Sequence, residues 1–246
     1  LEGAQIRHGM RGAAGAIEKV TIGDDVDVIT VGDVPAIGIC GSGLIDACAK
    51  MLDAGVLDAS GLLRRDVDAE KTPELAKRSL KGDHGREFVL EWSAKAGKDE
   101  DITLTQGDIR QFQLAKSAIY SGIVMLQKVM DVSDEALGEL MLCGGFGNYI
   151  NIASAVTVRL LPELPHEKIS YVGNAASLGA QMALLSETER NRAWELARSI
   201  EHVALAASPD FQTIFIEGMS FGDDPNAGRK HEKVERPRRK RAQAGG

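Results

Sequence analysis

The stretch LMLCGGFGNYINIASAVTVRLLPELP, residues 140–165, decides the fold of this chain. A strand is predicted over Glu139–Leu142, and it runs directly into the glycine-rich turn Gly144–Gly147. A helix is predicted over Ala153–Val158, and the prolines of LLPELP end it. The order strand, glycine turn, helix is typical of layered α/β proteins, in which ligands bind at the carboxyl ends of strands.

Two further glycine-rich turns lie outside this stretch. GICGSG, Gly38–Gly43, precedes a helix that begins near Ser42–Gly43, and GNAASLG, Gly173–Gly179, follows a strand predicted over Ile169–Val172. Glycines let the backbone approach a ligand closely, and the first N–H groups of a helix attract phosphate or ribose oxygens. None of the turns matches the P-loop or the GxGxxG pattern. The presence of three glycine-rich turns in one chain indicates nucleotide binding. The alternative is that these glycines only allow the chain to reverse direction.

The other elements also alternate between strands and helices. Strands are predicted over Ala16–Ile22, Val26–Val31 and 202–205, and a helix over 188–199. A long helix starts at Thr105–Asp108, a loose variant of the capping box. Apolar residues then recur at three- to four-residue spacing, apart from one wider gap at Ala115–Lys116, which predicts a helix stripe that faces the core. The residues of this stripe are Ile109, Phe112, Ile119, Ile123, Leu126 and Met130.

The predicted organisation is one domain followed by a tail. Residues 1–222 form the domain, and the charged, irregular segment 58–101 is expected to be a surface excursion on it. Residues 223–246 are polar, basic and broken by glycine and proline, so they are predicted to be a disordered tail.

Composition and charge exclude several classes of protein. Aromatic residues make up only 4% of the 246 residues, which does not suit single-strand nucleic-acid recognition by base stacking. The net charge is −7, although the tail is basic, so the body is strongly acidic and nucleic acid is not an expected partner. No run of about 18 apolar residues is present, so no membrane helix is expected. Three cysteines without CxxC spacing indicate a reducing compartment, and the cytoplasm is the expected location.

The residues 140–165 resemble the adenosine motif of the actin, sugar-kinase and chaperone ATPase superfamily, which has a ribonuclease-H-like fold. GNAASLGAQMALL resembles the second connecting helix of that superfamily. An ordered set of motifs over roughly residues 1–221 is similar more specifically to the reductive activators of corrinoid proteins. The motifs of this set are EGAQIRHGMRGAAGAIEKV, GICGSGLID, LTQGDIRQFQLAKSAI, CGGFGNYI, VGNAASLGAQMALL and ASPDFQTIFIEGMSF.

This resemblance implies a function for the whole protein. Members of the family couple ATP to an uphill electron transfer, in which a [2Fe–2S] cluster reduces Co(II) of a corrinoid protein in a methyltransferase system to Co(I). The implied cofactors are ATP with Mg²⁺, and the cluster is expected only in an N-terminal ferredoxin-like domain outside this sequence. The two phosphate-binding loops are also expected outside it. The catalytic acidic residue therefore cannot be named, and this fragment alone is expected not to turn over.

The resemblance also implies binding residues, which fall into three groups. Those expected to border the adenosine are Gly144, Gly145, Phe146, Gly147 and Asn148. Those expected to open a helix toward the ribose or phosphates are Gly41, Ser42 and Gly43. Those expected near the hinge are Gly173 and Asn174. Structural alternatives remain: Phe146 as core, and Ser42 and Asn148 as helix caps. The five histidines show no metal-ligand spacing, so no metal site is expected from them.

Two other classes of function remain open from the sequence. A small-molecule kinase can be built on the same fold, and a non-enzymatic docking module would use the glycine turns only structurally. Ferredoxin-type cysteines upstream favour the activator, whereas a sugar-binding insertion favours the kinase.

Overall fold

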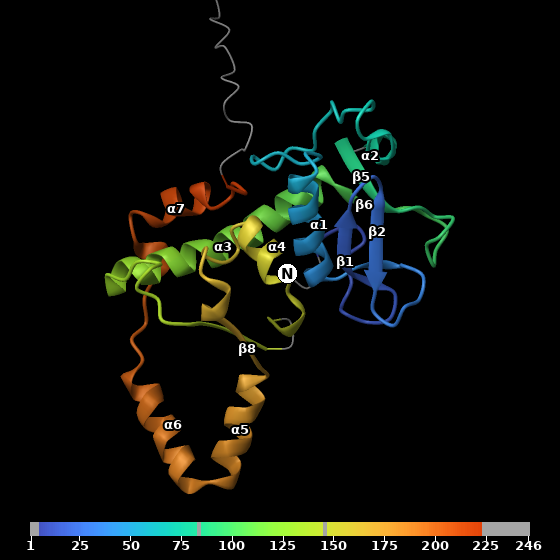
Figure 1. The fold of residues 1–246 in the computed structure, drawn as a ribbon. Helices are drawn as coiled ribbons and strands as arrows, with labels where there is room; N and C mark the ends of the chain where they lie inside the picture. Colours follow the sequence, from blue (N-terminus) through green and yellow to red (C-terminus); the bar gives the residue numbers. More distant parts are fainter. Residues whose placement is uncertain (1–4, 83–84, 145–146, 223–246) are drawn as a thin grey trace, which may run out of the picture.

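The computed structural model describes residues 5–82, 85–144 and 147–222, and Figure 1 shows how their elements are arranged. The first sheet has three strands in the order β2-β1-β3. Strands β1 (Ala16–Ile22) and β2 (Val26–Thr30) form an antiparallel hairpin, and β3 (Gly38–Ile39) pairs with β1 in parallel. Helix α1 (Gly41–Asp53) packs on β1 and is buried along most of its length.

A second sheet of three strands follows helix α2 (Pro73–Arg78). Its strands β4 (Ser79–Gly82), β5 (Gly85–Glu91) and β6 (Ile102–Thr105) are antiparallel. Phe88 and Leu90 of β5 are fully buried and belong to the same core as α1. The segment 58–101, expected on the surface, therefore supplies part of the main core.

A buried arginine joins the two sheets. The Arg78 side chain is 3% exposed and donates to the Asp25 carboxylate, with its Nε at 2.5 Å from Oδ1 and Nη2 at 3.0 Å from Oδ2. Its Nη1 also donates to the carbonyls of Val89 and Leu90. One side chain thus ties the β1–β2 turn to strand β5, and the bidentate pairing offsets the burial of its charge.

The long helix α3 (Gln106–Met130) begins at the predicted capping box. The Thr105 side chain accepts from the Asp108 N–H, and the Asp108 carboxylate accepts from the Thr105 N–H. The prediction of a core-facing stripe, however, is wrong for the second half of the helix. Ile109 and Phe112 are buried, whereas Leu126 is 49% and Met130 69% exposed.

The middle of α3 binds the C-terminal segment through polar side chains. Lys116 is fully buried, and its Nζ donates to the carbonyls of Gly218 at 2.7 Å and Ser220 at 2.5 Å. Gln113 donates to the carbonyl of Met219, and Phe112 stacks on Phe221. These carbonyls lie just beyond α7 (Phe211–Glu217), where a cation is favoured by the helix dipole. The family-like motifs over 104–119 and 207–221 therefore contact each other.

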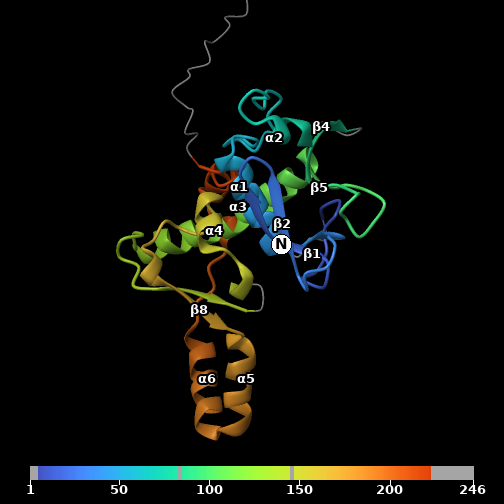
Figure 2. The same cartoon turned by 45° about the vertical axis from the view of Figure 1, so that its right-hand side comes forward.

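The last part of the chain is more open. Strands β7 (Leu140–Cys143) and β8 (Ile169–Gly173) form a parallel pair, with α4 (Ile152–Thr157) between them in the chain. Helices α5 (Ala175–Leu185) and α6 (Glu187–Ser199) form a hairpin that projects from the body (Figures 1 and 2) and has no buried residue.

Three short 3-10 helices complete the described chain, at Gly147–Tyr149, His166–Lys168 and Leu205–Ala207. The predicted strand over 202–205 is wrong: residues 200–204 are irregular and lead into the last of these helices. Within the described ranges, no helix is long and apolar enough to cross a membrane.

Candidate functional site

The first predicted turn, GICGSG, joins β3 to α1. The N-cap of α1 is Cys40, and the Ser42 hydroxyl pairs with Cys40 Sγ at 3.2 Å, so the alternative in which Ser42 is the N-cap is wrong. Gly41, Ser42 and Gly43 are buried, and their N–H groups have no acceptor among the described residues. The start of a helix with unpaired N–H groups can bind the oxygens of a phosphate or ribose.

Gly43 also has a packing role. A Cβ at this position would lie 2.1 Å from the Ile17 carbonyl oxygen, so only glycine lets α1 approach β1 this closely. At Gly38, a Cβ would lie 2.6 Å from the His8 carbonyl oxygen. Gly38 and Gly43 are therefore required by the fold, whether or not a nucleotide binds beside them.

The other two turns are joined directly to each other. The Gly144 N–H donates to the Gly173 carbonyl at 2.7 Å, at the carboxyl ends of the parallel strands β7 and β8. Gly144 has a φ of 92° and Gly173 a φ of 75°, in the region that favours glycine. No described atom lies within 4 Å of a Cβ at either position, so the space beside these two glycines is open.

The remaining predicted residues lie around this junction. Asn174 is the N-cap of α5, and its Oδ1 accepts from the Ser177 N–H at 3.1 Å. Gly147 is buried against the end of β7. Gly145 and Phe146 lie outside the described residues, as does the side chain of Asn148.

A buried aspartate of helix α1, Asp46, is hydrogen-bonded to helix α4. Asp46, in the second turn of α1, accepts from the Val20 N–H at 2.8 Å and from the Ser154 hydroxyl at 2.5 Å. Ser154 lies in the first turn of α4, whose N-cap is Asn151. The second turn of α1 and the first turn of α4 are therefore side by side. Sequence reasoning missed Asp46, and the available signal was an acidic residue within the apolar face of the helix.

Another polar residue, His8, lies next to the GICGSG turn. The His8 carbonyl accepts from the Ile39 N–H, and its imidazole Nδ1 lies 2.8 Å from Lys98 Nζ. Burial lowers the pKa of His8, and the neighbouring Lys98 ammonium lowers it further. A neutral imidazole that accepts a hydrogen bond from Lys98 fits both effects.

The structure thus links α1 to α4 through Asp46 and Ser154, and it brings Gly144, Gly173 and the start of α5 together at the carboxyl ends of β7 and β8. Backbone N–H groups at helix starts suit the phosphate and ribose oxygens of a nucleotide. Among the described residues, no group of three or more His, Cys, Asp or Glu could hold a metal ion.

Known proteins resemble this chain over nearly its whole length. The corrinoid activation enzyme RamQ of Eubacterium limosum is 33% identical over 225 residues, which cover 91% of this chain and 38% of that protein. The solved structure of a reductive activator for corrinoid, iron-sulfur protein is 40% identical with a TM-score of 0.80, and the match covers 89% of this chain and 34% of that one.

The chain thus spans little more than a third of the length of these two relatives. The family described as the C-terminal domain of RACo, the ASKHA domain, matches residues 1–229. This match and the α/β architecture confirm both the fold class and the resemblance that the sequence indicated. The chain belongs to the family of RACo C-terminal ASKHA domains.

Proposed function

We propose that this chain is the adenosine-binding side of an ATP-dependent reductive activator of a corrinoid protein. The observation that carries the proposal is the Gly144–Gly173 junction, where two glycine turns meet at the carboxyl ends of parallel strands. Relatives whose names state corrinoid activation support the choice of reaction. Three free cysteines fit a reducing compartment, so we assign the reaction to the cytoplasm.

The residues of the chain have distinct parts in this proposal. Gly144, Gly145, Phe146, Gly147 and Asn148 border the adenosine. The N–H groups of Gly41, Ser42 and Gly43 bind ribose or phosphate oxygens, while Gly173 and Asn174 lie near the hinge. ATP, bound as its Mg²⁺ complex, supplies free energy for moving one electron from a [2Fe–2S] cluster to Co(II), which becomes Co(I). The corrinoid protein belongs to a methyltransferase system, and neither the cluster nor this partner is held by the described residues.

The test uses the protein encoded by the full parent reading frame. ATP affinity is measured by isothermal titration, and formation of Co(I) on a corrinoid protein is followed by absorbance with ATP or ADP. We expect Co(I) only with ATP. Reduction that is equal with ATP, with ADP and without nucleotide would refute the coupling. Transfer of phosphate to a small alcohol, without corrinoid reduction, would indicate a kinase instead.

A matched pair of variants tests the placement of the adenosine. Gly144 has a φ of 92° and Gly55 a φ of 69°. At both positions, a Cβ added to the glycine would have no described atom within 4 Å. Gly144→Ala and Gly55→Ala therefore introduce similar backbone strain, but only the first puts a methyl group beside the junction. We expect Gly144→Ala to weaken ATP binding by about tenfold or more, and Gly55→Ala to leave it unchanged. Equal effects would mean that the junction is only structural.

A further inference from the structure

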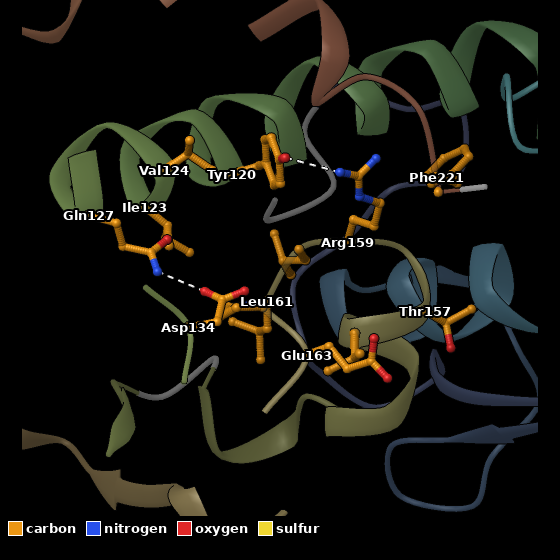
Figure 3. A pocket seen from close by; sticks show the side chains of 14 residues that line it. Tyr120, Ile123, Val124, Gln127, Asp134, Thr157, Arg159, Leu161, Glu163 and Phe221 are labelled. Atoms are coloured by element: carbon orange, nitrogen blue, oxygen red, sulfur yellow. Dashed lines mark hydrogen bonds between the residues drawn. The ribbon is translucent and has the colours of Figure 1, made fainter. Parts of the chain in front are cut away.

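A cavity of about 510 Å³ opens between α3, the C-terminal end of α4 and the segment 159–163 (Figure 3). This volume lies within the usual range of small-molecule sites. None of the residues assigned above to the nucleotide lines the cavity. Because its lining includes Val156 and Thr157, it lies at the opposite end of α4 from the β7–α4 turn. It is therefore a separate candidate site.

The cation in this cavity, Arg159, occupies a backbone position that usually belongs to glycine. Arg159 follows the end of α4 with a φ of 56°, and the Leu160 N–H donates to the Ala155 carbonyl at 2.8 Å. Residues other than glycine are strained at this position of a helix end. The arginine is nevertheless held in place, since its guanidinium lies over the Tyr120 ring and donates to the Tyr120 hydroxyl at 3.0 Å.

The guanidinium of Arg159 keeps most of its hydrogen-bond donors unused. Among the described residues, only the bond from Nη2 to Tyr120 uses one of its five N–H groups. Whichever Nη2 hydrogen makes this bond, one of the two forked edges of the guanidinium keeps both of its N–H groups. Stacking on Tyr120 fixes the plane of the group, so this free edge has a defined direction. The two oxygens of a carboxylate match such an edge.

The positive charge at this end of the cavity is not neutralised. Arg159 has no ion-pair partner among the residues that the structure describes. A second cation is near, because Lys116 Nζ lies 4.9 Å from the centre of the Phe221 ring, and Phe221 lines the same cavity. Burial and, after it, the Arg159 guanidinium lower the pKa of Lys116 to about 7. An anion beside Arg159 would offset this repulsion between like charges.

The acidic residues of the cavity leave the Arg159 end free. Gln127 Nε2 donates to Asp134 Oδ1 at 2.7 Å, and Gln127 follows Tyr120 by two turns of α3, a rise of about 10.5 Å. In Figure 3, the Arg159–Tyr120 pair and the Gln127–Asp134 pair accordingly lie apart from each other. Glu163 is exposed, so solvent and salt screen its charge. A ligand held by Arg159 therefore does not depend on Asp134.

We propose that the Arg159 end of this cavity binds a small monocarboxylate with a short aliphatic body. The carboxylate pairs with the free edge of the guanidinium, and the aliphatic body packs on Ile123 and Leu161, which line the cavity. Inorganic phosphate is a poorer match, because its strong acceptor oxygens need more donors than one guanidinium edge supplies. A cation would be repelled by Arg159, and a wholly apolar ligand would cover the guanidinium without pairing it.

The ligand test compares three molecules on the full 246-residue chain by isothermal titration at pH 7. 4-Methylpentanoate has the carboxylate and a branched aliphatic body, 4-methylpentanamide has the same shape without the charge, and inorganic phosphate has the charge without the body. We expect 4-methylpentanoate to bind, and the other two to bind at least about tenfold more weakly. No binding of 4-methylpentanoate, or equal binding of its amide, would overturn the proposal. Tighter binding of phosphate would overturn the choice of a carboxylate.

Three variants locate the binding. Arg159→Gly removes the guanidinium and relieves the backbone strain, so it should melt close to the parent temperature and bind 4-methylpentanoate about tenfold or more weakly. Arg159→Lys keeps the charge and loses the forked edge, so it should bind about threefold or more weakly. The matched control Asp134→Asn removes a charge two turns away and should bind within about twofold of the parent. Parent-like binding by Arg159→Gly, or a tenfold loss in Asp134→Asn, would refute this site.

Discussion

The region from β1 to the middle of α3 and the region from β7 to α6 are built in contrasting ways. In the first, buried charged groups such as Asp46 and Arg78 join elements that are far apart in the sequence. In the second, α5 and α6 have no buried residue, and Met141 and Tyr171 of the parallel pair are exposed. The comparison teaches that the two parts of the candidate site differ: Gly41–Gly43 are buried in the tightly packed first region, whereas the open glycines Gly144 and Gly173 lie in the second.

The largest expected effect comes from the apolar core of the first region. Phe88→Ala should lower the free energy of unfolding by about 3–5 kcal/mol, because it leaves a cavity in a fully buried position. Leu184→Ala in α5, where Leu184 is 77% exposed, should change it by less than about 0.5 kcal/mol. Urea unfolding of both variants measures the difference. Similar losses would show that the second region is packed as tightly as the first.

The next effect concerns the tie between α1, β1 and α4. Asp46→Ala removes the acceptor of the Val20 N–H and the Ser154 hydroxyl, so two buried donors lose their partner. We expect a loss of about 2–4 kcal/mol, measured by urea unfolding. The control Glu74→Ala breaks an exposed pair with Lys77 and should lose at most about 1 kcal/mol. A loss no larger than that of the control would mean that Asp46 does not hold the two helix starts together.

Stability should also depend on pH through Lys116. Burial lowers the pKa of its ammonium from 10.5 to about 7. Between these values the unfolded chain binds a proton that the folded chain has released. The free energy of unfolding therefore rises with pH from about 7 upward, by at most about 1.4 kcal/mol per unit. Lys116→Met should lose this slope in urea unfolding between pH 7 and 9. The absence of a slope from Lys116 in this range would show that the two carbonyls and the Phe221 ring keep its pKa near or above the ordinary value despite burial.

The smallest expected effect lies where β8 of the second region is tied to the main core. The Tyr171 hydroxyl of β8 donates to the Ile150 carbonyl at 2.6 Å, and Ile150 belongs to the main core. Tyr171→Phe should lower the free energy of unfolding by about 0.5–1.5 kcal/mol. Hydrogen exchange should show the loss mainly in β7 and β8. Faster exchange in β1 and α1 instead would mean that the two regions unfold as one unit.

What the sequence could predict was local. The capping box at Thr105–Asp108 and the glycines at Gly144 and Gly173 depend on neighbouring residues, so their patterns indicated the structure correctly. The α3 stripe was wrong beyond its middle because helical spacing shows which side chains share a face, but not what covers that face. The segment 202–205 has strand-like composition, but no described strand pairs with it.

Hydrogen bonds between residues far apart in the sequence could not be predicted from the sequence, for a physical reason. Asp46 and Ser154 are 108 positions apart, and Lys116 and Gly218 are 102 apart, so no pattern within a window contains both partners. A charged residue on a helix usually indicates a solvated face. Asp46 and Lys116 were therefore not identified from the sequence. Asp46 nevertheless fixes elements around the candidate site, and Lys116 fixes the C-terminal segment.

The Lys116 contact has a consequence for the order in which the chain folds during synthesis. Lys116 leaves the ribosome 102 residues before the Gly218 carbonyl that it binds, an interval of about 5–20 s at usual translation rates. Throughout that time the middle of α3 lacks the Gly218 carbonyl for Lys116 and the Phe221 ring that stacks on Phe112. Emergence of the segment that ends at Phe221, rather than formation of α3, therefore sets the moment at which this part of the core can close.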